Sequence, residues 1–267
     1  MGFVLSCATT PKRIHNLLCI IPQLKLNYKY FVINICEEYK RFGKFKIPKA
    51  LLKLSKQNKR VVFQFVDDFG PVCKYIGGFQ FMKKKNLKDD KLIIIDDDTF
   101  YHKDLFYELM DEKTTTNITT GSGFNYGENG NYQIVYGSTQ MVEGYGGICF
   151  DYDQCSDFIN WYVGFYKCIA GGGDAIGDLL DKYLMASFLG DDFILSNVYT
   201  EKSAIKGGRQ YIRPCDYGFN ADALHKNNVF GSNMGSYSFL KENIIILETF
   251  KLKYLLNQSI NEVRTIS

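Results

Sequence analysis

The sequence predicts an α/β fold: one domain with a central, mostly parallel sheet flanked by helices. In the first half, short apolar runs alternate with segments of helical periodicity, which is the pattern of parallel strands joined by helices. The 267 residues suffice for one large core, and the composition of 46% hydrophobic and 23% charged residues is typical of globular proteins. No internal repeat, low-complexity segment or linker divides the chain. We therefore expect a single domain over residues 1–267.

The first predicted strand is the apolar run Gly2–Cys7. A helix is expected directly after it, because Thr10 can act as its N-cap and Pro11 can occupy its first position, where a missing N–H costs nothing. The apolar side chains of this helix share one face: Ile14, Leu17, Leu18 and Ile21.

Three further strands follow in the first hundred residues, at Tyr30–Cys36, Val61–Val66 and Leu92–Ile95. The last is short and wholly apolar, as a central parallel strand is. Pro71 opens a helix between the last two strands, and another helix is expected around His102–Met110.

The second half changes character, because glycines and aromatic residues crowd between residues 121 and 147 and predict hairpins or loops around a cleft. Helical spacing then predicts a core helix over Cys155–Tyr166. A loop is expected at Gly171–Gly173, followed by a helix through Leu179–Leu184. Asp191 and Asp192 open a last helix over Phe193–Tyr199.

Composition narrows the classes of partner and compartment. The net charge of +3 gives no reason to expect nucleic acid. The eight cysteines stand singly, without Cys-x-x-Cys spacing, and several lie in apolar runs, so we interpret them as reduced core residues of a cytoplasmic protein. The sequence contains no apolar run of about 18 residues, so no membrane span is predicted. The N-terminus lacks the pattern of a signal peptide.

The strongest local signal is the triplet of carboxylates Asp96, Asp97 and Asp98 at the end of the fourth predicted strand. Three adjacent acids repel one another, so a bound cation is their natural compensation. In open α/β sheets, ligands collect at the carboxyl ends of the strands, where these acids would lie. Capping of the following helix is the structural alternative, but one acid suffices for that.

A phosphatase with an aspartate nucleophile would also present acids after a strand. Its motif is Asp-x-Asp-x-Thr after the first strand, whereas here Thr99 follows Asp98 directly and the strand is the fourth. The spacing therefore disfavours this class.

An apolar strand ending in Asp-x-Asp resembles the metal site of glycosyltransferases with the GT-A fold. Three more segments agree with one group of that fold, in chain order. Thr9–Ile14 is similar to its Thr-x-Pro-x-Arg-Ile segment, Asp68–Lys74 to its Asp-Tyr-Gly-Pro-x-x-Lys segment with Phe69 replacing Tyr, and Gly190–Phe193 to its late acidic pair. The group includes enzymes of bacteria and of large DNA viruses. The resemblance covers roughly residues 3–200.

The resemblance implies a bound Mn²⁺ or Mg²⁺ ion and a nucleotide-sugar donor, with a UDP-sugar favoured. Asp98 is then the first metal ligand. Asp96 faces the ribose or the ion, and Asp97 belongs to the same nucleotide site. His225 stands where many GT-A enzymes have a further metal ligand, although a lone histidine is more often structural.

Other positions of the resemblance would bind the donor. Thr9 and Thr10 begin the first segment, in which Arg13 can bind a diphosphate with two donors, and Lys74 can act as a point charge. Asp68 can accept hydrogen bonds from the base or the ribose. Surface positions for the two cations, and a turn role for Asp68 before Gly70-Pro71, are the structural alternatives.

In the acceptor half, Gly146 and Gly147 would lie beneath the transferred sugar, or would form a tight turn into an edge strand. Asp192 is the expected general base on the acceptor hydroxyl, and Asp191 is its partner and the expected helix cap. Aromatic rings in this half offer faces for sugar rings, or belong to the core: Tyr126, Tyr132, Tyr136, Tyr145 and Trp161.

The resemblance thus implies a metal-dependent glycosyltransferase, with the nucleotide bound by residues 1–100 and the acceptor by residues 101–267. It implies a glycan or another hydroxyl acceptor, in the cytoplasm, or in that of the host if the protein is viral. One alternative is a non-catalytic nucleotide- or glycan-binding protein on the same scaffold, for which Asp192 would face away from the cleft. The other is a metal-dependent phosphoryl-transfer enzyme, but the sequence contains neither a Walker-type loop nor a kinase signature.

Overall fold

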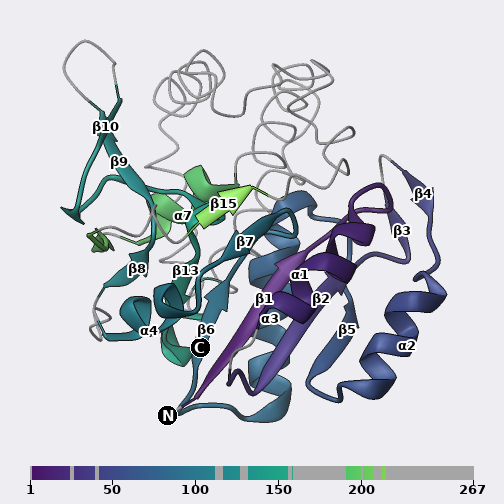
Figure 1. Cartoon of the computed structure of the whole chain (residues 1–267). Helices are drawn as coiled ribbons and strands as arrows, with labels where there is room; N and C mark the ends of the chain where they lie inside the picture. Colours follow the sequence, from purple (N-terminus) through teal and green to yellow (C-terminus); the bar gives the residue numbers. More distant parts are fainter. Residues whose placement is uncertain are drawn as a thin grey trace, which may run out of the picture.

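The computed structural model describes residues 2–24, 27–39, 42–111, 117–126, 132–155, 158, 191–199, 201–206 and 212–214. Its centre is an eight-stranded sheet, mostly parallel in its first half, with helices on both faces (Figure 1). The strand order is β11-β14-β8-β13-β6-β1-β2-β5. The predicted α/β class is confirmed.

Four neighbouring parallel strands make up the first half of the sheet. They are β1 (Phe3–Ala8), β2 (Tyr30–Ile35), β5 (Val61–Phe65) and β6 (Lys91–Ile94). Each is found within one residue of its predicted bounds. The strands β1, β2 and β6 lie in the middle and are almost wholly buried, which explains why their sequences are continuous apolar runs.

Beyond β6 the sheet contains strands of both directions. There β13 (Ile148–Phe150) runs antiparallel both to β6 and to β8 (Ile118–Thr120). Two short strands complete this edge, β14 (Lys202–Ala204) and β11 (Gly137–Ser138). The hairpin expected between residues 121 and 147 is present in a small separate sheet of β9 (Gly123–Tyr126), β10 (Tyr132–Ile134) and β12 (Met141–Val142). Two-stranded pairs join β7 (Thr99–Tyr101) to β15 (Ile212–Pro214), and β3 (Glu38–Tyr39) to β4 (Gly43–Lys44).

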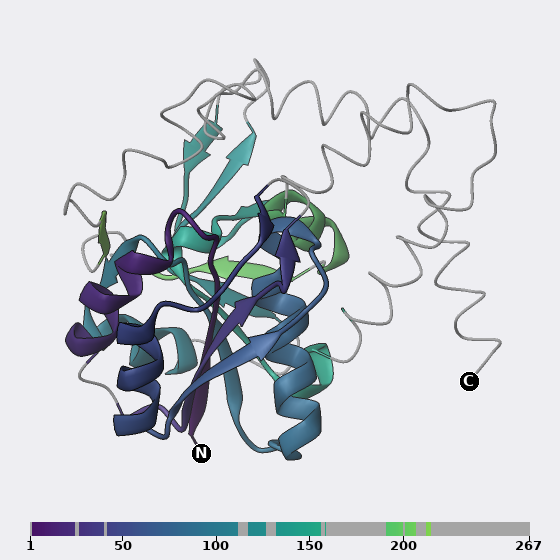
Figure 2. The ribbon, with the colours of Figure 1, turned by 90° about the vertical axis from the view of Figure 1, so that its right-hand side faces the viewer.

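Helices cover the sheet in two layers, as Figure 2 shows for α1 and α2 on one face and α3 on the other. One apolar cluster packs beneath α1 (Leu17–Gln23), α2 (Lys49–Gln57) and α4 (Lys103–Asp111). The opposite cluster packs beneath α3 (Cys73–Lys85) and α7 (Asp191–Val198). A 3-10 turn, η2 (Gly70–Val72), leads into α3, so the helix predicted at Pro71 is present.

The first predicted helix begins later than expected. Residues 11–13 form a turn in which the Thr10 carbonyl accepts the amides of Arg13 and Ile14, at 3.0 and 2.9 Å. A 3-10 turn, η1 (Ile14–Asn16), then leads into α1, and its N-cap is Arg13 without a side-chain bond. The prediction of Thr10 as a side-chain cap and Pro11 as the first helical residue was therefore wrong.

Several predictions fall outside the described residues. They concern most of the helix at 155–166, the loop at 171–173, the helix at 179–184, and His225. In the parts that the structure describes, no helix is both long and apolar enough to cross a membrane.

Candidate active site

The site lies where β1 and β6 end side by side. The two strands pair in parallel, with Ser6 opposite Ile94, and the Ile95 amide donates to the Ser6 carbonyl at 2.9 Å. Their carboxyl ends therefore deliver the segment after β1 and the three acids after β6 to one edge of the sheet. At this edge the Thr9 hydroxyl donates to Asp97 Oδ2 at 2.5 Å, so residues 88 positions apart in sequence meet.

Asp97 faces inward, with only 2% of its side chain exposed. Besides Thr9, its carboxylate accepts a hydrogen bond from Arg13 Nη2. Burial raises the pKa of Asp97 to about 6; the Arg13 charge opposes this shift, and the Asp98 charge adds to it. Asp97 thus fixes the segment from Thr9 to Arg13 against the end of β6.

Asp96 and Asp98 are more accessible, with 25% and 18% of their side chains exposed. Asp97 lies in the turn between β6 and β7, and its carboxylate points to Thr9 and Arg13 instead. Asp98 Oδ2 lies 2.9 Å from Arg13 Nη2. Arg13 Nε is buried and has no hydrogen-bond partner among the described residues.

Lys74, in the first turn of α3, connects the two halves of the chain. Only 6% of its side chain is exposed, and its Nζ lies 2.8 Å from Asp96 Oδ1 and 2.9 Å from Asp191 Oδ2. Burial opposes the charge on Lys74, but the two carboxylates outweigh it and raise the pKa of the lysine well above its usual value. In turn, Lys74 lowers the pKa of Asp96 despite the burial of that carboxyl.

Asp192 belongs to the same cluster, at the start of α7. Its Oδ1 accepts a hydrogen bond from the Tyr75 hydroxyl at 3.0 Å, and its Oδ2 accepts the Gly144 amide at 2.8 Å. Burial, followed by the charge of Asp191, raises the pKa of Asp192 to about 7. A carboxyl with this pKa can exchange a proton near neutral pH.

Gly144 leaves the space that the side-chain ends of Asp192 and Lys74 occupy. A Cβ there would lie 2.6 Å from both Asp192 Oδ1 and Lys74 Nζ. The missing side chain therefore lets the backbone amide reach the carboxylate. The predicted site residues were the neighbouring Gly146 and Gly147, whereas in the structure Gly144 contacts the carboxylate.

Gly146 and Gly147 have a packing reason of their own. A Cβ on Gly146 would lie 2.6 Å from the Ser122 amide nitrogen, and Gly147 adopts φ +77°, which favours glycine. Asp68 accepts the Gly70 amide on Oδ1 at 3.0 Å, as a turn residue does. Thr10 contributes the backbone carbonyl that closes the turn before η1.

Two tyrosines that contact the candidate site were not predicted from the sequence. Tyr75 holds Asp192, and the Tyr101 hydroxyl accepts the Asp96 amide at 2.8 Å. Both rings are also core residues, and nothing in their spacing separates them from other buried aromatics. The adjacency of Tyr75 to Lys74 was the one available signal.

The donor set suits a hard divalent cation, because carboxylate oxygens are the ligands that Mg²⁺ and Mn²⁺ prefer. The like charges of Asp96 and Asp98 both act to raise the pKa of Asp97, which is the repulsion that a cation would relieve. In the described structure the oxygens of these acids turn toward Arg13 and Lys74. Asp96 and Asp98, the accessible pair, are the residues that would hold the ion.

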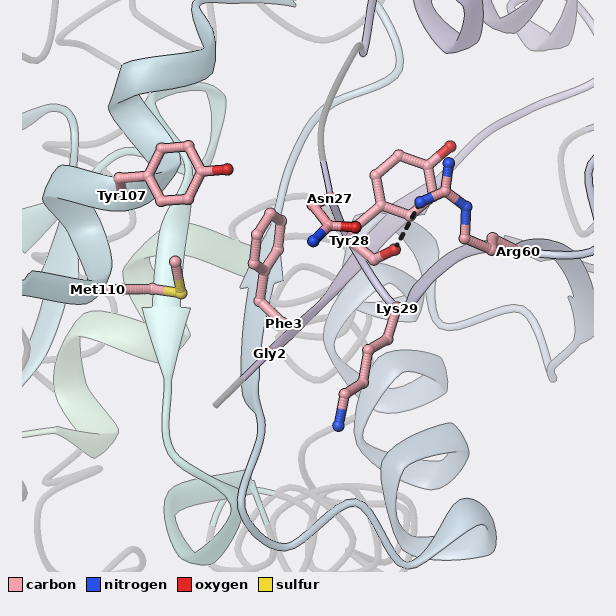
Figure 3. Close-up of a pocket in the computed structure, with 8 residues that line it drawn as sticks. All are labelled: Gly2, Phe3, Asn27, Tyr28, Lys29, Arg60, Tyr107 and Met110. Carbon is pink, nitrogen blue, oxygen red and sulfur yellow. Dashed lines mark hydrogen bonds between the residues drawn. The ribbon is translucent and has the colours of Figure 1, made fainter.

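A cavity of about 440 Å³ lies at the other end of the sheet, around the start of β1 (Figure 3). There Arg60 stacks on the Tyr28 ring, 4.8 Å from its centroid, and donates to the Tyr28 carbonyl at 3.3 Å. None of the acids lines this cavity, which is therefore separate from the candidate active site. Its lining residues are Gly2, Phe3, Asn27, Tyr28, Lys29, Arg60, Tyr107 and Met110.

No protein-family model matches the chain, and no curated protein matches it. Among solved structures, the chain is similar to a 4-diphosphocytidyl-2C-methyl-D-erythritol synthase, with 9% identity and a TM-score of 0.37, over 57% of this chain and 73% of that one. It is also similar to the apo structure of WbbM, a bifunctional glycosyltransferase, with 14% identity and a TM-score of 0.37, over 77% of this chain and 38% of WbbM. Likenesses this distant assign no function.

Proposed function

We propose that the chain is a divalent-metal-dependent glycosyltransferase that moves a sugar from a nucleotide diphosphate donor to a hydroxyl acceptor. One observation carries the proposal: Lys74 pairs with Asp96 after β6 and with Asp191 at the start of α7. The acids expected to bind the donor and the acids expected to serve the acceptor therefore belong to one cluster of ion pairs.

On the donor side, we propose that Arg13 and Lys74 bind the diphosphate. Arg13 keeps 22% of its side chain exposed, so its guanidinium can contact a bound oxyanion. Thr9 and Asp97 hold Arg13 in place, and Thr10 closes the same turn. In the proposal the nucleoside, with uracil as the favoured base, extends along the sheet edge toward Asp68.

Asp98, with Asp96, would hold a Mn²⁺ or Mg²⁺ ion, and His225 is proposed as a further ligand. When bound, such an ion supplies Lewis-acid stabilisation of the charge on the leaving diphosphate. The protein's own cations, Arg13 and Lys74, act on the same charge from fixed positions.

On the acceptor side, Asp192 is the proposed general base. Its pKa of about 7 suits a group that must be ionised to accept a proton and must then hold it. Asp191 neutralises Lys74, and Gly144 and Tyr75 orient Asp192. Gly146 and Gly147 form the adjacent turn, which we propose lies beneath the transferred sugar.

The test is a screen of nucleotide sugars for thermal stabilisation, with and without Mn²⁺, followed by product analysis with glycan acceptors. A donor at a hundred times its dissociation constant should stabilise the protein by about 2.7 kcal/mol. We expect UDP-sugars to do so only with the metal. A protein that no nucleotide sugar stabilises would contradict the proposal, and one that binds donors without turnover would be the binding protein of the alternative.

A further inference from the structure

A second group of potential metal ligands lies at the same edge of the sheet, two strands away from the acids. Cys36 directly follows β2, Cys73 is the first residue of α3, and Asp68 lies in the connection between β5 and α3. Their sulfur and carboxylate atoms all lie within 4.8 Å of one another. Three chain segments thus bring three ligand atoms to one point.

We propose that Cys36, Cys73 and Asp68 bind one Zn²⁺ ion. Two thiolates and a carboxylate are a set that zinc accepts, and thiolate ligands select against the hard ions that the all-oxygen acid cluster suits. A water molecule or the Asp67 carbonyl oxygen, which already lies 3.3 Å from Cys73 Sγ, completes the coordination.

The surroundings hold the two sulfur atoms in fixed positions. Both cysteines are buried, with 2% and 3% exposure, in a small apolar cluster with Tyr39. The Phe69 amide donates to Cys73 Sγ at 3.3 Å, and an outer partner of this kind orients a ligand. Asp68, more accessible than either cysteine, gives the ion a route from solvent.

A bound ion would fasten the loop between β5 and α3 to the end of β2. The effect reaches the active site, because Tyr39 packs in the same cluster and its hydroxyl donates to the Thr9 carbonyl at 2.9 Å. Thr9 in turn bonds Asp97. We therefore assign the ion a structural role, beside the donor site and outside its chemistry.

A disulfide between Cys36 and Cys73 is the competing interpretation. It accounts for the two sulfur atoms and leaves Asp68 as the acceptor of the Gly70 amide. The proposal also assigns Asp68 a ligand other than the nucleoside. The two roles are distinguishable, because zinc binding is measured without any nucleotide.

The experiment uses the full chain without an affinity tag, reduced and dialysed against metal-free buffer. We titrate it with Co²⁺, whose thiolate charge-transfer absorption reports sulfur ligands, and then displace the Co²⁺ with Zn²⁺ to measure affinity and stoichiometry. One ion per chain is expected. Cys36→Ser and Cys73→Ser should each weaken Zn²⁺ binding by at least about 10–100-fold, the cost of losing even an outer partner of a ligand.

Cys19→Ser is the matched control, because Cys19 lies on α1, outside the cluster, and its loss should leave the absorption unchanged. If either cluster variant fails to fold, Asp68→Asn replaces it and should also weaken Zn²⁺ binding by at least about tenfold. Absence of the thiolate band, its survival in both cysteine variants, or a Cys36–Cys73 disulfide in the protein as isolated would each overturn the proposal. Because zinc binding is measured without nucleotide and without Mn²⁺, failure of this proposal is distinguishable from failure of the proposed function, which has its own screen.

Discussion

At the scale of single residues, the site is a set of like charges held together by two cations. Arg13 lies within ion-pair distance of Asp97 and Asp98, and Lys74 within that distance of Asp96 and Asp191. The Asp192 carboxylate accepts hydrogen bonds from two uncharged groups, the Tyr75 hydroxyl and the Gly144 amide. Burial and the charge of Asp191 raise the pKa of Asp192, whereas Lys74 outweighs burial at Asp96 and lowers the pKa of that carboxyl. Carboxylates of one cluster are thereby prepared for different tasks.

Asp98→Asn should abolish the dependence of nucleotide diphosphate binding on Mn²⁺ while leaving the fold intact, because it removes an accessible carboxylate of the proposed metal pair. Calorimetric titration with UDP and GDP, each with and without Mn²⁺, measures this. Asp104→Asn, on the exposed start of α4, is the control and should bind as wild type does. Unchanged metal dependence in Asp98→Asn would remove this residue from the site.

Asp192→Asn should retain donor binding and lose about 10²–10⁴-fold in transfer rate, the usual contribution of a general base. In the wild type, the rate should rise with pH through the pKa of about 7, because only the ionised carboxylate accepts a proton. Initial rates between pH 5 and 9 test both statements. Wild-type turnover by the variant would instead indicate a retaining mechanism, in which no such base is needed.

Asp192→Asn should lower the transfer rate but raise the stability of the fold. The folded-state pKa of about 7 exceeds the ordinary value of 3.8, so folding favours the protonated carboxyl. That contribution is complete below pH 3.8 and is lost as the pH rises through about 7. Asp192→Asn should therefore gain stability relative to the wild type between pH 4 and 7, and keep that gain above pH 7. Denaturation curves at several pH values provide the measurement.

At the scale of elements, the turn before β13 separates two kinds of glycine. Gly144 faces the ends of flexible side chains, Asp192 and Lys74, whereas Gly146 faces the backbone of Ser122. If a Cβ is added at Gly144, the ends of the Asp192 and Lys74 side chains can move aside at small cost, but they then leave the positions proposed for catalysis. Backbone cannot move aside without disturbing the strand beside it.

Gly144→Ala should therefore fold and lose about 10²-fold in transfer rate, the cost of misplacing a reacting group by about 1 Å. Gly146→Ala should instead lose about 1–3 kcal/mol of stability through overpacking. Paired measurements of rate and of urea denaturation compare the two neighbours directly. A Gly144→Ala enzyme with wild-type rate would show that Asp192 needs no fixed position.

The sequence predicted the elements unevenly, for identifiable reasons. Long buried strands such as β1 and β2 can be recognised in the sequence as apolar runs. The strands of the second half have two to four residues, too few for a periodicity, so the reversal of direction at β13 could not be foreseen. The helix α2 was missed because it buries one residue, Leu51, and is otherwise rich in lysine. Pro11 was misread because a turn tolerates it as well as a helix does.

The candidate site was predictable in its parts and not in its connections. An Asp-x-Asp after a buried strand can be recognised, but which of the three carboxylates is buried depends on the turn after β6 and on the contacts of Asp97 with Thr9 and Arg13. The Lys74–Asp191 pair joins distant segments, and a lysine in a helix is usually exposed. Only the fold reveals that Lys74 is buried, that Asp191 reaches it, and that Gly144 rather than Gly146 approaches the base.

At the scale of the whole molecule, Lys74 is the one described lysine that joins the parallel half of the sheet to α7. Lys74→Met should cost about 3 kcal/mol of unfolding free energy, because it leaves Asp96 and the buried Asp191 without their cation. Lys84→Met, exposed near the end of the same helix, should change stability by less than about 0.5 kcal/mol. Urea denaturation measures the unfolding free energy of both variants. If Lys74→Met were as stable as Lys84→Met, water and not Lys74 would compensate the charges of the acids.

The distance along the chain between the two halves of the cluster has a consequence for biosynthesis. The strands β1, β2, β5 and β6 all lie within the first 94 residues, so this layer can form while the rest of the chain is still being translated. Tyr75 and Asp192 are 117 residues apart, so their bond must wait until α7 has left the ribosome. A product of premature termination before α7 would carry every residue proposed to bind the diphosphate, yet its buried lysine would lack Asp191. Such fragments should be substrates for quality-control proteases rather than half-active enzymes.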